Sequence, residues 1–319
     1  MKESSFKPAW WLPGPHLQTL WPVLCRRKKK EIHLRRERFE LPDGDFVDLD
    51  WAGDTGPIVL VLHGLEGSIH SNYAQGILQV LVENGWRGLF MHFRGCSGEP
   101  NRLPRSYHSG ETQDLAWVVG AITRREPLVP FAAIGFSLGG NVLLKWLGES
   151  GKSNPLVAAV AISVPFELNK ASKRFQRGFS KVYQWHLLNC LRKRLAKKFE
   201  DRPPHIGLPP LSSLKTLWEF DEKVTAPLHG FSGAEEYYLL SSSRQFLYKI
   251  QVPTLLIQAK DDPFMTEDLI PEIKELSPQV KLELTPSGGH VGFVMGKFPW
   301  SSEYWLEQRI PDFLRNYFK

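Results

Sequence analysis

The chain has 319 residues, of which 42% are hydrophobic and 23% are charged, and its formal net charge is +6. This composition is typical of a globular protein and excludes an intrinsically disordered one. No apolar run approaches the ~20 residues that cross a bilayer, and Pro and Gly interrupt the N-terminal apolar residues, so we expect neither a membrane-spanning helix nor a signal peptide.

The positive charge is concentrated in one segment of the chain. Residues 168–199 contain ten Lys or Arg and no acidic residue, so the remaining sequence is net acidic. Because the charge is local and no nucleic-acid-reading motif accompanies it, we expect no nucleic-acid partner.

Three cysteines, Cys25, Cys96 and Cys190, are odd in number and widely separated. They fit neither a disulfide framework nor a zinc motif, which indicates free thiols and a cytoplasmic location. No metal-ligand spacing, dinucleotide-binding glycine pattern or P-loop lysine is present, so we expect no metal and no cofactor.

The predicted elements begin with a Trp- and Pro-rich segment, residues 1–30, which we interpret as packed on the domain surface; an interfacial anchor is the alternative. Residues 39–41 and 46–51 flank a Pro-Asp-Gly turn and predict a β-hairpin. Buried strands are then predicted at 58–62, 88–93, 131–136 and 156–164, with helices at 72–84, 112–123 and 138–148 between them. This alternation predicts an α/β fold with a mostly parallel, doubly wound sheet.

The alternation stops at Pro165 and resumes near residue 254. A strand at 254–257, a helix near 266–275, a strand at 280–284 and a closing helix at 302–317 are predicted there. We therefore expect a single α/β-hydrolase-type domain over residues 1–319, with residues 165–250 inserted as a helical cap between the sixth and seventh core strands.

A Gly-x-Ser-x-Gly sequence, residues 135–139, lies between a predicted strand and a predicted helix. That context is the one a nucleophile elbow requires. Gly135 and Gly139 carry no side chain that would collide in so sharp a turn, and the following helix directs its positive end toward developing negative charge. We therefore predict that Ser137 is the nucleophile.

A serine nucleophile needs a base and an orienting carboxylate, which in this architecture lie on loops after strands. Asp262 and His290 occupy such loops, and the chain order Ser137, Asp262, His290 is that of α/β hydrolases. We predict His290 as the base and Asp262 as the acid; Asp261 is an alternative that the sequence does not separate from Asp262, and Glu167 is a third candidate.

Two backbone amides are predicted to hold the oxyanion. The N–H of Leu138 follows the nucleophile, and the N–H of Leu65 lies in the loop after the strand at 58–62. His63 is interpreted as support for that loop rather than as a second base or a metal ligand. Cys96 would be a nucleophile only if Ser137 were irrelevant.

Seven motifs together resemble one known family. They occupy residues 63–68, 94–101, 107–112, 135–141, 226–231, 261–264 and 288–293. These motifs resemble the YheT-like hydrolases, a branch of the α/β-hydrolase superfamily related to eukaryotic abhydrolase-domain proteins and yeast medium-chain ethyl-ester acyltransferases. The resemblance implies a Ser–Asp–His esterase or acyl-transfer enzyme and supports Ser137, Asp262 and His290. Eukaryotic relatives usually carry an N-terminal membrane segment, and none is visible here.

Within the insertion, apolar residues recur at spacings of three or four with Lys and Arg between them: Phe179, Tyr183, Leu187 or Leu188, Leu191, Leu195 and Phe199. This pattern predicts a basic amphipathic helix. We interpret it as a cap helix whose apolar side packs on the core. The alternative is a peripheral contact with anionic membrane through the basic 170–199 segment.

The combined prediction is a serine carboxylic-ester hydrolase that forms an acyl-enzyme on Ser137, acting on a small-molecule ester with a short- to medium-chain acyl group. Two alternatives remain: transfer of the acyl group to an alcohol, and a low-turnover ligand-binding protein on the same fold. The sequence determines neither the physiological substrate nor the oligomeric state.

Overall fold

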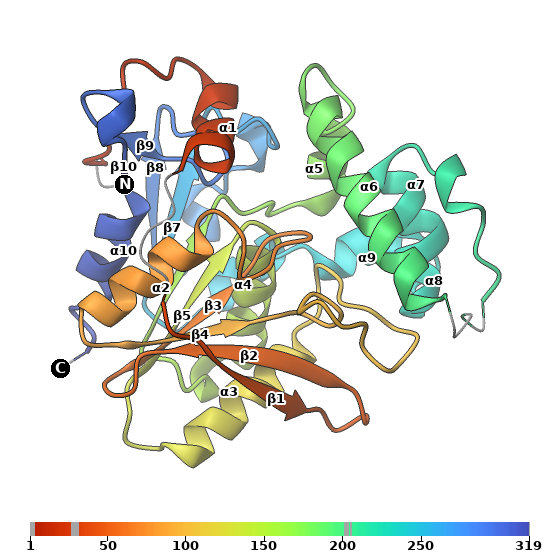
Figure 1. Cartoon of the computed structure of the whole chain (residues 1–319), viewed down its shortest axis with the longest axis horizontal. Helices are drawn as coiled ribbons and strands as arrows, with labels where there is room; N and C mark the ends of the chain where they lie inside the picture. The colour runs from red at the N-terminus through yellow and green to blue at the C-terminus, as the bar shows by residue number, and fades with distance from the viewer. Residues whose placement is uncertain (1–3, 27–31, 201–203, 205, 319) are drawn as a thin grey trace.

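The computed structural model describes residues 4–26, 32–200, 204 and 206–318. Among them, an eight-stranded sheet has the order β1-β2-β4-β3-β5-β6-β7-β8 (Figure 1). Its strands are β1 (Arg35–Glu40), β2 (Phe46–Ala52), β3 (Ile58–Leu62), β4 (Arg87–Met91), β5 (Phe131–Phe136), β6 (Ala158–Ile162), β7 (Thr254–Ala259) and β8 (Val280–Thr285). The hairpin strands β1 and β2 pair antiparallel, and β2 also pairs antiparallel with β4. The remaining pairs, along β4-β3-β5-β6-β7-β8, are all parallel.

The strands of the sheet centre are buried on both faces because helices cover both sides. Strand residues such as Leu60 pack in one apolar core with α3 (Gln113–Arg125) and α4 (Leu138–Ser150). The next residue, Val61, points to the other face and packs in a second core with α2 (Ala74–Glu83) and α10 (Leu306–Leu314). The prediction of an α/β, mostly parallel doubly wound sheet is confirmed.

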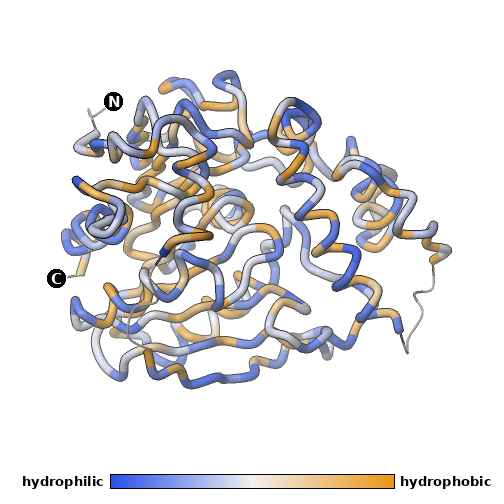
Figure 2. The backbone as a smooth tube through the Cα atoms, turned by 45° about the horizontal axis from the view of Figure 1, so that its top comes forward, coloured by the Kyte–Doolittle hydropathy of each residue, from blue (hydrophilic) through white to orange (hydrophobic). Residues whose placement is uncertain are grey.

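The chain leaves the sheet after β6 and returns at β7, and the segment between them forms a separate helical layer at the right of Figure 1. Its helices are α5 (Leu168–Arg174), α6 (Ser180–Lys198), α7 (Leu217–Phe220), a π-helical turn (Asp221–Thr225), α8 (Ala226–Leu228) and α9 (Ala234–Ser241). Blue and orange stretches alternate along the tube on this side of the molecule (Figure 2). We continue to interpret residues 165–250 as a cap.

The predicted amphipathic helix corresponds to α6. Its buried residues Tyr183, Leu188, Leu191 and Leu195 pack against Leu217 and Phe220 of α7 in an apolar core of the cap. The apolar side of α6 is therefore covered mainly by other cap residues.

Two C-terminal helix predictions need correction. Residues 266–275 form two short 3-10 turns, Glu267–Leu269 and Ile273–Glu275, rather than one helix. Pro271 lies between them, lacks an N–H donor and disfavours helical geometry at the residue before it. The closing helix begins at Leu306 rather than near residue 302, because the preceding backbone of β10 (Glu303–Tyr304) pairs with β9 (Val294–Met295).

The N-terminal segment contains a helix, α1 (Pro15–Cys25), that lies against the end of the chain. The buried side chain of Gln18 accepts a hydrogen bond from Val294 N at 2.8 Å and donates one to Val294 O at 3.2 Å. Residues 27–31, which carry most of the N-terminal basic cluster, lie outside the described residues. The described part of the segment packs on the domain as interpreted.

Candidate active site

Ser137 lies at the turn between β5 and α4. Its φ of 52° and ψ of −117° are strained for a residue with a side chain. Ser137 N donates to Ile162 O at 2.8 Å, which fixes this turn to the neighbouring strand. A Cβ atom on Gly135 would lie 2.5 Å from Gly139 O, and one on Gly139 would lie 2.5 Å from His63 O. Both glycines are therefore required by close backbone contacts.

The imidazole of His290 lies between Ser137 and Asp262. Its Nε2 atom is 3.0 Å from Ser137 Oγ, and its Nδ1 atom is 2.8 Å from Asp262 Oδ2. Asp262 is 3% exposed, and its other carboxylate oxygen accepts a hydrogen bond from Phe264 N at 2.9 Å. The ring of Phe264 stacks on the imidazole with 4.0 Å between centroids. The imidazole is thereby held by polar contacts at both nitrogens and by an aromatic face.

The two neighbouring aspartates have different contacts. Asp261 Oδ1 accepts a hydrogen bond from Gly289 N at 2.9 Å, so this carboxylate contacts the backbone of the histidine loop. Burial raises the pKa of Asp261 above its usual value. Glu167, the third candidate for the acid, pairs with Lys170 and Arg244. Of the three carboxylates, Asp262 is the one in contact with His290.

The loop after β3 lies close to Ser137. A Cβ atom on Gly64 would lie 3.3 Å from Ser137 Cβ. The N–H groups of Gly64 and Glu66 donate to the hydroxyls of Tyr73 and Tyr107, both at 2.9 Å, and Gly67 N donates to Gly64 O. Leu65 N and Leu138 N have no acceptor among the described residues, and both residues line the same cavity as Ser137. These two amides are available to an oxygen of a bound molecule.

His63 and Cys96 lie at or near this loop, but neither has the protonation state of a reactive group. Phe93 N donates to His63 Nε2 at 3.2 Å, and His63 Nδ1 lies 2.7 Å from Gly64 O, which defines a neutral imidazole. Burial lowers the pKa of His63 to about 3. Burial raises the pKa of the Cys96 thiol to about 12, so this thiol is protonated near neutral pH.

Sequence reasoning missed the part of α1 that supports the histidine loop. His290 N donates to Thr19 Oγ1 at 2.9 Å, and Thr19 Oγ1 donates to Pro15 O at 2.7 Å. Cβ atoms on Gly289 and Gly292 would lie 2.6 Å from Pro15 O and 2.2 Å from Gln18 O. Those glycines were the available signal, because they indicate that another backbone approaches closely.

A cavity of about 610 Å³ lies between the sheet edge, α1 and the cap, and Ser137, His290, Leu65 and Leu138 line it. Most other lining residues are apolar or aromatic: Leu20, Val23, Phe175, Val182, Tyr183, Trp185, Leu187, Leu191, Leu195, Leu217, Phe220, Val224 and Leu228. One part of the wall is acidic: Asp221 accepts hydrogen bonds from Thr225 and Tyr238 at 2.7 Å, and burial raises its pKa to about 6. Within the described ranges, no group of His, Cys, Asp or Glu is arranged to hold a metal ion.

Comparison with known proteins agrees with this fold and site. The sequence profile of the family described as alpha/beta hydrolase fold matches residues 57–296. The chain is 47% identical over 309 residues to YheT of Escherichia coli (strain K12), whose name ascribes an esterase activity to it; the match covers 95% of this chain and 90% of that protein. It is 31% identical to phospholipase ABHD3 of Mus musculus, over 86% of this chain and 70% of the relative.

A solved structure extends the comparison to the fold. The esterase Pf2001 of Pyrococcus furiosus superposes with a TM-score of 0.60 at 19% identity, covering 90% of this chain and 94% of that chain. The chain therefore belongs to the α/β-hydrolase fold family. Within that family it belongs to the YheT-like branch, and the expectation of an esterase-type hydrolase is confirmed at the level of the family. In the part of the chain that the structure describes, no helix has both the length and the apolar character that spanning a membrane requires.

Proposed function

We propose that the protein is a serine carboxylic-ester hydrolase whose catalytic residues are Ser137, Asp262 and His290. The observation that carries this proposal is the continuous contact from Asp262 Oδ2 to His290 Nδ1 and from His290 Nε2 to Ser137 Oγ, at 2.8 and 3.0 Å. Both distances are within hydrogen-bonding reach, as proton transfer requires.

In the proposed mechanism, His290 takes the proton of Ser137 as its oxygen attacks the ester carbonyl. Asp262 orients the imidazole and stabilises the imidazolium that forms. The N–H groups of Leu65 and Leu138 bind the oxyanion, and loss of one such donor costs about 3 kcal/mol of transition-state stabilisation. The imidazolium then protonates the leaving alcohol, and water activated by His290 hydrolyses the acyl-enzyme.

We propose an ester with a short- to medium-chain acyl group as the substrate. The cavity of about 610 Å³ and its mainly apolar wall support this choice, because an alkyl chain gains free energy from removal of its surface from water. The names of the esterase and lipase relatives, including a monoacylglycerol lipase of Saccharomyces cerevisiae, agree with an ester substrate.

The first test is labelling of the purified protein with a fluorophosphonate probe, comparing wild type with Ser137→Ala, followed by assays with p-nitrophenyl esters of increasing chain length. Labelling and hydrolysis that both disappear in Ser137→Ala are expected. A well-folded wild type that neither reacts with the probe nor cleaves esters would instead favour a low-turnover binding protein.

Acyl transfer to an alcohol is the alternative reaction, since it differs only in which nucleophile reaches the acyl-enzyme. Product analysis with ethanol present separates the two reactions. If an ethyl ester is the main product at low ethanol concentration, the proposed reaction becomes acyl transfer rather than hydrolysis.

We also propose that the cavity mouth contacts an anionic lipid surface through the segment from the end of α5 to the N-terminal half of α6. Val182 and Trp185 of α6 and Val23 of α1 line the cavity yet are 50%, 65% and 63% exposed. The rings of His16 and Phe179 are in tilted contact, with 4.6 Å between centroids, so α1 and the start of α6 adjoin there. Lys173, Arg177 and Lys181 are exposed on the same part of the basic 170–199 segment.

Vesicle flotation tests this contact. Changing Lys173, Arg177 and Lys181 together to Gln is expected to abolish binding to anionic vesicles and to leave hydrolysis of a soluble ester unchanged. Equal binding of the variant and the wild type would exclude the contact.

A cytoplasmic location is the remaining proposal. It is supported by the three free thiols, of which Cys25 is exposed. Fractionation of cells that express the native protein tests it, and recovery with a periplasmic or secreted fraction would contradict it.

A further inference from the structure

Arg194 of the cap helix α6 contacts the loop that carries the Leu65 amide. Its guanidinium pairs with the Glu66 carboxylate through two contacts, Nη2 to Oε1 at 2.7 Å and Nε to Oε2 at 3.2 Å. The same guanidinium lies over the ring of Tyr107, 4.7 Å from its centroid. A fork of this kind fixes direction as well as distance.

Glu66 is the residue of the loop that most needs such support. Its φ of 56° is in the left-handed region, which is strained for a residue with a side chain. The Tyr107 hydroxyl contacts Glu66 twice: it accepts from Glu66 N and donates to Glu66 Oε1, both at 2.9 Å. Glu66 is therefore held by Tyr107 on the body and by Arg194 on the cap.

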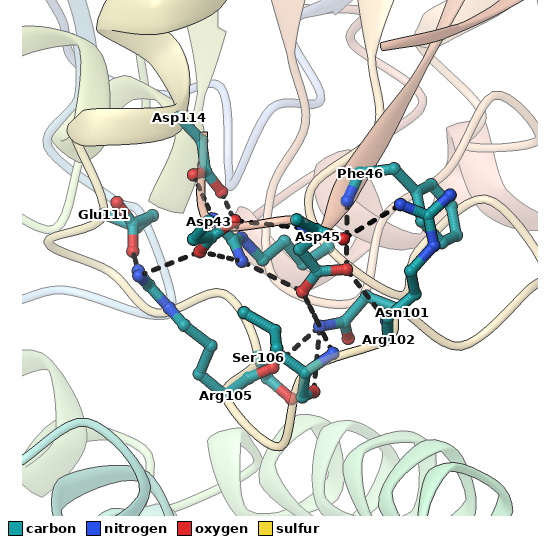
Figure 3. Close-up of polar contacts among 12 residues, drawn as sticks. Asp43, Asp45, Phe46, Asn101, Arg102, Arg105, Ser106, Glu111 and Asp114 are labelled. Carbon is teal, nitrogen blue, oxygen red and sulfur yellow. Dashed lines mark hydrogen bonds and ion pairs between the residues drawn. The ribbon is translucent and has the colours of Figure 1, made fainter. Parts of the chain in front are cut away.

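Tyr107 is itself held in place by ring packing and by the polar contacts of the preceding loop. Its ring stacks on Phe93 with 5.3 Å between centroids and an interplanar angle of 9°. The chain that leads to it is fixed by a cluster in which Arg94 pairs with Asp114 and Asp45, and Asn101 donates to Asp45 at 2.5 Å. Figure 3 shows the carboxylate of Asp45 and the amide of Asn101 pointing toward one another.

A second contact fixes the same face of α6. Lys198, one turn after Arg194, donates to Arg105 O at 2.6 Å and to Asn101 Oδ1 at 2.5 Å. The helix that carries Arg194 is therefore also attached to Asn101 and Arg105, in the segment that precedes Tyr107. Displacement of α6 would withdraw the Arg194 guanidinium from Glu66.

We propose that Arg194 is a positioning residue that sets the Leu65 N–H for the oxyanion and thereby couples seating of the cap to catalysis. This inference rests on the proposed esterase function. Leu65 directly precedes Glu66, and the amides of Gly64, Glu66 and Gly67 are already paired, so the position of Glu66 constrains the residue that carries the one unpaired amide among these four.

The test compares Arg194→Gln with the neighbouring exposed Lys193→Gln as the matched control. Hydrolysis of p-nitrophenyl butyrate by Arg194→Gln should show kcat lower by on the order of 10- to 100-fold with little change in KM, since a misplaced donor is lost mainly in the transition state. Arg194→Lys keeps the charge but not the two-pronged contact, so its kcat should lie between those of wild type and Arg194→Gln. Lys193→Gln should match wild type.

A pair of inhibitors separates positioning from general damage to the pocket. The Ser137 oxygen adds to the carbonyl of an alkyl trifluoromethyl ketone and forms an oxyanion, whereas the matched trifluoromethyl carbinol carries the same substituents but has no carbonyl and forms none. Arg194→Gln should weaken inhibition by the ketone about as much as it lowers kcat and should leave inhibition by the carbinol unchanged.

Glu66→Gln removes the same ion pair from the loop side, so the test remains available if one variant misfolds. The double variant should lose little more than either single variant. Wild-type kcat and ketone inhibition in Arg194→Gln, or equal losses for ketone and carbinol, would overturn this inference alone. An inactive wild type would overturn the esterase proposal and this inference together.

Discussion

The turn that carries Ser137 and the loop that carries His290 are built in different ways. The Ser137 turn is marked by one short stretch, Gly135 to Gly139, in which a Cβ atom on Gly135 would meet Gly139 O; a Cβ atom on Gly139 would meet the backbone of Leu62 and His63 at the end of β3. The His290 loop is held by residues distant in sequence: Asp261 lies 28 residues before Gly289, and Thr19 lies 271 residues before His290. A short sequence motif therefore marks the serine turn, whereas the His290 loop depends on hydrogen bonds to Asp261 and Thr19 that no local motif marks.

The largest expected effect is a difference in kcat between substitutions of Asp262 and Asp261, the two aspartates that contact the His290 loop. Asp262→Asn should lower kcat by about 10⁴-fold, because the amide neither stabilises the imidazolium nor enforces the required tautomer. Asp261→Asn should lower kcat less than about threefold, since its side-chain oxygen can still accept from Gly289 N. Steady-state kinetics on both purified variants measures this difference, and a larger loss in Asp261→Asn would reverse the assignment.

A substitution in the turn that carries Ser137 should lower the stability of the fold. Gly139→Ala should lower the free energy of unfolding by about 3 kcal/mol, because its new methyl group would lie 2.5 to 2.6 Å from the carbonyl oxygens of His63 and Leu62. Gly207→Ala, at an exposed position with open space around it, is the control and should change stability by less than about 0.5 kcal/mol. Denaturant unfolding measures both; a stable Gly139→Ala would show that the elbow tolerates a side chain.

A smaller effect is expected at the distant support of the base. Thr19→Val keeps the shape of the side chain but leaves His290 N without its acceptor, at a cost of about 1–3 kcal/mol. Because the imidazole is displaced as well, kcat should fall roughly 10-fold. Thr19→Ser retains the hydroxyl and should behave as wild type. If Thr19→Val keeps full activity, α1 only covers the loop.

The smallest effect concerns pH and the attachment of the cap. Burial lowers the pKa of Lys198 from 10.5 to about 7. The folded state then binds fewer protons than the unfolded state between these values, so the free energy of unfolding should rise from pH 7 to pH 8 by at most about 1.4 kcal/mol. It should level off below pH 7, where Lys198 is protonated in both states. Unfolding curves at several pH values should lose this slope in Lys198→Met and keep it in Lys193→Met.

The parts that sequence predicted well are those whose physical cause is local. Continuous apolar runs such as 58–62 indicate buried parallel strands because both faces must be covered, and a Gly-x-Ser-x-Gly between strand and helix indicates a sharp turn. The predicted helix near 266–275 was wrong because one proline outweighed the surrounding helical pattern.

Contacts between distant segments could not be predicted in the same way. The hydroxyl of Thr19 and the guanidinium of Arg194 act on loops far from them in sequence. An amphipathic pattern identifies the apolar side of α6, yet it does not separate charges that meet solvent from charges that meet the body, and Arg194 and Lys198 belong to the second group.

The contact between α1 and the His290 loop has a consequence for synthesis of the protein. His290 leaves the ribosome 271 residues after Thr19, so the hydrogen bond from His290 N to Thr19 forms only when the whole chain between them has emerged. A nascent chain that has already folded its sheet as far as Ser137 still lacks the base and its support. Under the proposed function, hydrolysis is therefore withheld until residue 290 has been synthesised, and fragments that end before it carry an inert serine.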